Sequence, residues 1–476
     1  MKINILTSQR RDFGGGQHPS SGFGAGLALL LCLVGAKTAP ACSDYGGGLT
    51  LFARQAVSAE AEVAKAAIAT LRKAGPDGLR ALQETHAALL TNWRSGQADN
   101  SPEWARVRHA MDAVGQQKDC HASGLYWHTD LEQAKVAARA SGKPILSLRL
   151  LGQLDEELSC ANSRFFRTTL YANRDVAGTL NSNFVLHWES VRPVPKVKVD
   201  FGDGRELQTT VTGNSIHYVL SEDGAPIDAL PGLYSATAFQ CGLLVAGNAA
   251  KNYARLPAAE RPAYLRDYHR SQLALLATRW EADLKSVGAA PVSALAGIRR
   301  ITNAAPTAAL ACQLTVLKTG AERPFLQSIT IGAYPDAAQL DGMMNPDMWR
   351  RLGMLYAQIG RSPADTRLIR EKLPNAREAG RLTLAKSAAE TPVLDVFENL
   401  RRSIGEDTAR NEYQLHRRIR EWFVAARHAP DLKDLNGRVY ADLFLTPDSD
   451  PWLGLLAPDA FNAIENGGIK RSAVLR

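Results

Sequence analysis

The segment from Lys143 to Trp188 constrains the fold of this chain more than any other part of it. It begins with an apolar run, KPILSLRL, continues through a polar loop, GQLDEELS, and reaches Cys160 at the start of a helical pattern that leads into a second apolar run, FVLHW. Apolar runs of this length, bounded by turn residues, predict strands. The segment therefore predicts a strand, a cysteine at the start of a helix, and a second strand.

The residues on either side of this segment extend the same α/β pattern. Thr129 or Asp130 can cap an alanine-rich helix, and Gly142 can end that helix before the first strand. The helix after Cys160 is predicted to break near Asn173. Farther along the chain, we expect a hairpin around Gly202-Asp203-Gly204, a strand from Asn214 to Ser221, a turn at Glu222-Asp223-Gly224, a strand from Ala225 to Leu230 and a helix after Pro231.

This succession resembles the thioredoxin-fold proteins, particularly the long bacterial kind with helical extensions. The resemblance rests on A-x-x-x-A-x-x-x-GKPIL, a cysteine at a helix start, N-R-D-V-A-x-x-L-N-x-N-F-V and a later strand that ends in Asp-Gly, and it covers about residues 124–250. It implies a fold class of α/β, with a thioredoxin-like central domain at 119–255. Helical periodicity on both sides predicts mostly α-helical extensions, an N-terminal one at 42–118 and a C-terminal one at 256–476.

The chain departs from the thioredoxin pattern at three places. The family carries Cys-x-x-Cys, whereas this chain has Ser163 where the second cysteine would stand. The family's cis-proline is replaced by the turn Asn214-Ser215. The loop before the cysteine is longer than usual and carries three carboxylates, in the run from Asp155 to Glu157. Each departure argues against ordinary dithiol exchange.

The resemblance implies that Cys160 is the nucleophile, Ser163 a hydrogen-bond donor to its thiolate, and Asn214 and Ser215 the residues that position a partner disulfide. A helix N-terminus lowers a thiol pKa, whereas nearby carboxylates raise it, and the sequence does not decide between them. A single thiol could hold a mixed disulfide but could not release it internally. Two hypotheses stay open: a monothiol thiol-disulfide enzyme, and a non-catalytic scaffold or protein-binding module. A disulfide between Cys120 and Cys160 is a further alternative.

The N-terminus predicts export. Residues 1–41 contain basic residues, the apolar run LALLLCLV and a cleavage pattern at Ala39-Pro40-Ala41, which together are typical of a signal peptide. Arg10-Arg11 fits a twin-arginine route, and Cys42 resembles a lipoprotein acceptor. We expect a periplasmic protein or a membrane-anchored lipoprotein, which contacts the membrane only through the signal peptide or the lipid. Its expected partner is an envelope protein or a disulfide-bearing substrate.

Other functions lack a sequence signal. The formal net charge is +8, but the basic residues are scattered, so no nucleic-acid partner is expected. The cysteines form no close pair, and although His187 and His217 could join Cys160 in a metal site, we interpret both histidines as structural. No metal or cofactor is therefore expected. Cys241 and Cys312 lie in apolar helical sequence and are predicted to be buried.

Overall fold

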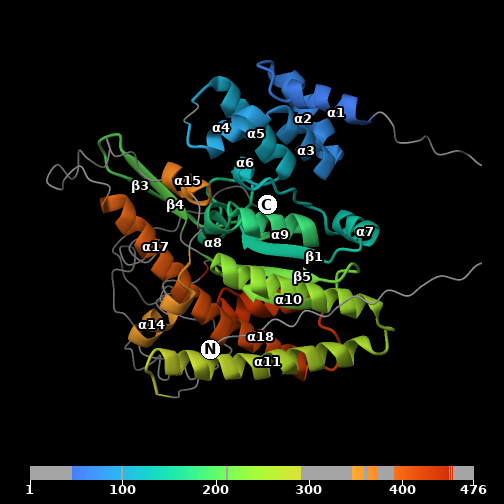
Figure 1. The fold of residues 1–476 in the computed structure, drawn as a ribbon, viewed down its shortest axis with the longest axis vertical. Coiled ribbons are helices and arrows are strands. Elements are labelled where there is room, and N and C mark those ends of the chain that lie inside the picture. The colour runs from blue at the N-terminus through green and yellow to red at the C-terminus, as the bar shows by residue number, and fades with distance from the viewer. Residues whose placement is uncertain are drawn as a thin grey trace, which may run out of the picture. The chain divides into compact units, whose positions relative to one another are not determined.

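The computed structural model describes residues 45–97, 100–210, 213–290, 346–358, 363–372, 391–449, 451 and 453. The predicted signal peptide, Cys42 and Cys312 lie outside these residues. The helices before the first strand are α1 (Tyr45–Gln55), α2 (Ala61–Lys73), α3 (Pro76–Thr85), α4 (Ala87–Arg94), α5 (Pro102–Gly115), α6 (Cys120–Ser123) and α7 (Leu131–Ser141) (Figure 1). The central elements are β1 (Ile145–Leu151), α8 (Ala161–Phe165), η1 (Phe166–Leu170), α9 (Arg174–Asn183), β2 (Val185–Arg192), β3 (Lys196–Asp200), β4 (Glu206–Thr210), β5 (Ser215–Leu220), β6 (Pro226–Pro231) and α10 (Ala236–Arg255). The later helices are α11 (Arg261–Ser286), α14 (Pro346–Tyr356), α15 (Pro363–Glu371), α17 (Thr391–Arg410), η3 (Asn411–His416), α18 (Arg417–Ala425), α19 (Leu432–Arg438) and η4 (Val439–Leu443).

The central feature is a mixed sheet of four strands in the order β2-β1-β5-β6. Strand β1 runs parallel to β2, with Ile145 opposite Val185, and antiparallel to β5, with Ile145 opposite Leu220. Strand β6 is antiparallel to β5. Every residue of β1 is buried, including Ser147 and Arg149. The other positions are apolar, as suits a strand covered on both faces.

Local signals in the sequence place the helices beside this sheet. The Asp130 side chain accepts hydrogen bonds from two backbone amides of α7, and Gly142 ends that helix with a φ of 65°. Asn173 caps α9 in the same way, so the predicted break is confirmed. The expected hairpin is also confirmed, as a separate two-stranded sheet formed by β3 and β4.

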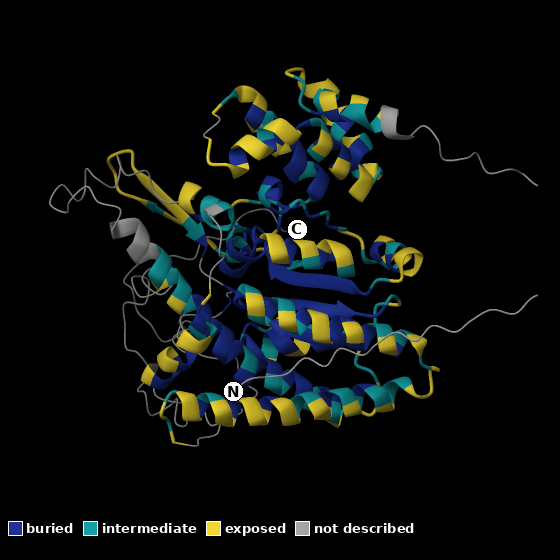
Figure 2. Cartoon of the chain, in the orientation of Figure 1, coloured by how far each residue is buried: buried dark blue, intermediate teal, exposed yellow. Residues whose placement is uncertain are grey.

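Helices cover the sheet. Helix α7 contacts β1 and β2, while α9 and α10 contact each other and lie along the strands (Figure 1). Strands β1, β5 and β6 are buried along their whole length, whereas the β3–β4 hairpin is largely exposed and the helices α9, α10 and α11 keep exposed outer sides (Figure 2). Among the described residues, no helix is both long and apolar enough to cross a membrane.

The buried apolar side chains of the described residues form three clusters. The largest surrounds the sheet and continues into the C-terminal helices through Ile419, Phe423 and Tyr440. A second cluster lies in the N-terminal helices, and a third joins α11, α14 and η3. The C-terminal helices therefore share the core of the sheet, although they follow it in the chain.

Candidate functional site

Cys160 stands where the sequence predicted it, directly before helix α8 and after the loop that leaves β1. It is the N-cap residue of α8, and its backbone amide donates to the carbonyl oxygen of Leu151 at 3.2 Å. The side chain is 0% exposed and is not in a disulfide. The thiol is thus placed at a helix start but is shielded from solvent.

Ser163 lies beside the thiol, with 3.4 Å between the Cys160 sulfur and the Ser163 hydroxyl oxygen. That oxygen is also 2.7 Å from the Ser159 hydroxyl and 2.7 Å from the Cys160 carbonyl oxygen. In this arrangement the Cys160 thiol donates toward the Ser163 oxygen, and the Ser163 hydroxyl donates to a neighbouring oxygen. The resemblance implied a different contact, in which Ser163 donates to a thiolate.

Asn214 and Ser215 belong to the segment that enters β5. The Asn162 side chain donates to the carbonyl oxygen of Gly213, which ties α8 to this segment. Both predicted positioning residues are buried, and the Asn214 side-chain oxygen and the Ser215 hydroxyl have no hydrogen-bond partner among the described residues. These two polar groups cannot be reached from solvent.

The C-terminal segment covers this region. The Tyr440 hydroxyl donates to the carbonyl oxygen of Asn214 at 3.2 Å, and the Asn214 amide donates to the Thr446 hydroxyl at 3.0 Å. Arg192 holds the same segment by donating to the Thr446 carbonyl oxygen at 2.7 Å. Burial, followed by the nearby Cys160, raises the pKa of Tyr440 well above its usual range. The predicted catalytic groups are therefore sealed beneath residues far away in the sequence.

The acidic loop before Cys160 forms ion pairs with lysines. Glu156 pairs with Lys196 at 3.6 Å, and the Glu157 carboxylate accepts hydrogen bonds from Lys372 at 2.8 and 2.9 Å. Burial raises the pKa of Asp155. Two of the three carboxylates are thus paired with lysines. One of these two, Glu157, lines a charged cavity that is described below.

The other cysteines give mixed results. Cys120 and Cys160 are both free thiols, so the disulfide suggested between them is not formed in this structure. The prediction that Cys241 is buried is wrong, because it is exposed on α10. The buried face of that helix runs through Phe239, Leu243 and Ala246, and Cys241 lies on the other side of the helical turn.

The two strand histidines are occupied by neighbouring side chains. His187 is hydrogen-bonded to the Ser147 hydroxyl at 2.9 Å, and His217 to the Tyr171 hydroxyl at 2.6 Å. Burial lowers the pKa of each histidine to about 3, so both are neutral at physiological pH. The described residues contain no group of three or more His, Cys, Asp or Glu side chains arranged to hold a metal ion.

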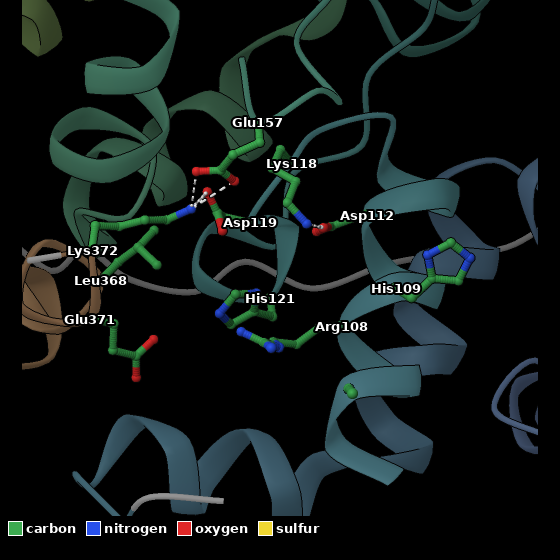
Figure 3. A pocket seen from close by; sticks show the side chains of 11 residues that line it. Arg108, His109, Asp112, Lys118, Asp119, His121, Glu157, Leu368, Glu371 and Lys372 are labelled. Atoms are coloured by element: carbon green, nitrogen blue, oxygen red, sulfur yellow. Dashed lines mark hydrogen bonds and ion pairs between the residues drawn. The ribbon is translucent and has the colours of Figure 1, made fainter. Parts of the chain in front are cut away.

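A cavity that the sequence did not predict lies between the N-terminal helices and α15. Its volume is about 360 Å³ (Figure 3). Its lining is unusually rich in charge and includes Ala105, Arg108, His109, Asp112, Lys118, Asp119, His121, Glu157, Leu368, Glu371 and Lys372.

The acidic groups of this cavity are paired with cations. Asp112 pairs with Lys118 at 2.9 Å, and Asp119 with Arg167 at 3.2 Å and Lys372 at 3.1 Å. Burial opposes the charge of Asp119, but the two cations outweigh it and lower the pKa of that carboxyl. Asp119 also has a φ of 63°, an unusual conformation that directs the chain from α5 into the short helix α6.

Nothing in the sequence linked the residues of this cavity, which come from three distant parts of the chain. The only local signal was the polar run Lys118-Asp119-Cys120-His121 directly after a helix.

No protein-family model, curated protein or solved structure gives a significant match to this chain.

Proposed function

We propose that this chain is an exported thioredoxin-like protein that serves as a non-catalytic binding module in the cell envelope. The observation that carries the proposal is the complete burial of Cys160, in the apolar cluster that also contains Tyr440 of the C-terminal helices. Thiol-disulfide exchange requires a thiolate that a substrate sulfur can reach. A substrate sulfur cannot reach a Cys160 sulfur that is 0% exposed.

The thioredoxin-like part of the proposal is supported by the arrangement around β1. Strands β1 and β2 are parallel, and the chain between them contains α8, η1 and α9 with Cys160 at the N-cap. An antiparallel pair, β5 and β6, and then α10 follow. The export part rests on residues 1–41, and the envelope partner follows from that location.

The β3–β4 hairpin offers a surface for such a partner. It pairs only within itself, outside the four-stranded sheet. Phe201 is 55% exposed and Leu207 is 46% exposed on it. An isolated hairpin with exposed apolar side chains gains stability when a partner covers it. We therefore assign the hairpin as the part of the module that contacts the envelope partner.

A second candidate function is monothiol exchange that begins once the C-terminal segment moves away. It is favoured by the free thiol at the start of α8 and by the unpartnered Asn214 oxygen and Ser215 hydroxyl next to it. Buried polar atoms without partners are costly and concentrate at functional sites. This candidate requires that the cover formed by Tyr440 and Thr446 opens in the native protein.

Thiol labelling of the folded protein, with peptide mass spectrometry, separates the two functions. Cys241 is exposed and serves as the internal control, because it should react at once. The binding-module proposal expects Cys160 to stay unlabelled until the protein is unfolded. Labelling of Cys160 in the native protein at a rate similar to that of Cys241, or capture of a mixed disulfide that Cys160→Ser abolishes, would establish the second candidate instead.

The partner surface is tested with a photo-crosslinking amino acid in cells. Placed at position 201, it should give a discrete crosslinked product. Placed at position 136, where Val136 is 64% exposed on α7, it should not. Equal crosslinking at both positions would show that the hairpin has no special role.

A further inference from the structure

The charged cavity contains a buried histidine whose polar atoms are not satisfied. His121 lines the cavity and is 1% exposed, and neither of its ring nitrogens has a hydrogen-bond partner among the residues that the structure describes. The ring packs edge-on against Trp93, at 4.7 Å between ring centroids, and Trp104, at 5.4 Å. Leaving a buried imidazole without partners is unfavourable, so its retention here points to a group that this structure does not contain.

His121 is neutral in this environment. Burial, opposed by the charge of Asp119 and reinforced by that of Arg108, lowers its pKa to about 3. A neutral imidazole carries one N–H donor and one acceptor nitrogen. It can therefore donate a hydrogen bond to a ligand at physiological pH without adding charge to the cavity.

Arg108 is the cation of this cavity that has no ion pair with any described residue. Arg108 is an exposed residue of α5, and its guanidinium carbon lies over the Trp104 ring, 5.9 Å from the ring centroid. Figure 3 shows the Arg108 side chain extending toward His121. A guanidinium fork and a nearby imidazole N–H together match the oxygens of a carboxylate or a phosphate.

The carboxylates of the cavity argue against a cationic ligand. Each of them already has a basic partner: Lys118 for Asp112, Arg167 and Lys372 for Asp119, Lys372 for Glu157, and Arg367 for Glu371. A cation would have to displace one of these, whereas an anion would meet the unpaired Arg108. The volume of about 360 Å³ lies at the lower end of the range for small-molecule sites.

We propose that this cavity binds a small anion, whose carboxylate or phosphate group is held between the Arg108 guanidinium and the His121 ring. Lys118 and Lys372 line the same cavity and are paired with its carboxylates. The site goes beyond the proposed function, because it is separate from Cys160 and does not depend on whether that thiol reacts.

The test is isothermal titration of the full-length chain with inorganic phosphate and, separately, with succinate, at constant ionic strength. Arg108→Gln removes the guanidinium, and His121→Phe removes the ring nitrogens but keeps an aromatic ring between the two tryptophans. Arg80→Gln is the matched control, since Arg80 is an exposed arginine of α3 that pairs only with Asp77 and does not line the cavity. Comparing the two probes shows whether the site prefers a phosphate or a carboxylate.

The wild-type chain and Arg80→Gln should bind at least one probe with the same affinity. Arg108→Gln should weaken that binding about tenfold or more, and His121→Phe should weaken it severalfold. No binding to the wild type of either probe at about 10 mM would overturn the proposal. Unchanged binding by Arg108→Gln would also overturn it, and this variant alters only an exposed side chain, so its folding is not at risk. The titration is repeated with Cys160→Ser. Because the cavity does not include Cys160, this variant should bind the probe as the wild type does, whatever the outcome of thiol labelling.

Discussion

Asp228 offers the sharpest test of how the C-terminal helices are held on the sheet. This residue of β6 is 1% exposed, and its two carboxylate oxygens accept hydrogen bonds from His416 at 2.8 Å and from the Tyr268 hydroxyl at 2.6 Å. Arg420 lies 3.8 Å from the second oxygen. Burial and Arg420 oppose the charge of His416, but Asp228 and Glu412 outweigh them and raise its pKa. The carboxylate thus neutralises cations on η3 and α18.

Replacing Asp228 with asparagine should lower the free energy of unfolding by about 2–4 kcal/mol. Removing one partner of a buried ion pair costs about 3–5 kcal/mol, because the remaining charge is left uncompensated. The amide has the shape of the carboxylate and keeps an oxygen that can accept from His416. One retained hydrogen bond offsets about 1 kcal/mol of that cost.

The measurement is urea unfolding followed by far-ultraviolet circular dichroism and tryptophan fluorescence. The matched control is Asp223→Asn, in the turn between β5 and β6, where the side chain is 52% exposed and lies 3.3 Å from Arg139. A surface pair of this kind contributes about 0–1 kcal/mol. The two variants make the same chemical change and differ in burial.

If Asp228→Asn and Asp223→Asn lowered the free energy of unfolding equally, within about 0.5 kcal/mol, the buried ion pair would contribute no more than a surface pair. A double-mutant cycle with His416→Gln gives a second check. If the buried pair is a unit, the two changes together should cost less than their sum, by about 1 kcal/mol or more.

Two further predictions concern pH and helix packing. Basic partners lower the pKa of buried Asp228 against the opposing effect of burial, so its contribution to stability is complete above the ordinary carboxyl pKa of about 4 and is lost as the pH falls through the lower folded value. The stability difference between the wild type and Asp228→Asn should therefore shrink from pH 6 to pH 3 in urea titrations, and a constant difference would contradict this prediction. The opposite holds for His416, whose pKa is raised in the folded protein. Its contribution to stability should be lost as the pH rises through the folded pKa of the imidazole. Gly405→Ala in α17 should destabilise the protein by about 1–3 kcal/mol, because a methyl group there would collide with the backbone of Gly353 in α14. Gly437→Ala in α19 is the control, because a methyl group there meets nothing within 4 Å, and it should be neutral or stabilising. Both variants are compared by thermal unfolding. A similar loss of stability in the two would argue against close packing at Gly405.

The sequence by itself determined the local elements around the sheet. The cap at Asp130, the stop at Gly142 and the cap at Asn173 each act within a few residues, through a side chain or a left-handed backbone that the amino acid itself favours. The apolar run of β1 likewise predicted a strand, which the structure shows buried along its length. These signals were sufficient to place Cys160 at the start of a helix after that strand.

Only the tertiary structure decided whether that cysteine is accessible. Tyr440 and Asn214, which close the region around Cys160, are 226 positions apart in the chain. No local pattern encodes a contact at that distance, because it depends on how the C-terminal helices pack against the core of the sheet. The same reason explains why the cavity at His121 was not foreseen, since its walls come from α5, α6, the loop at Glu157 and α15. Local sequence therefore determined the positions of Cys160 and His121 within their own helices. Long-range packing buried Cys160 in the core and placed His121 in the wall of a charged cavity.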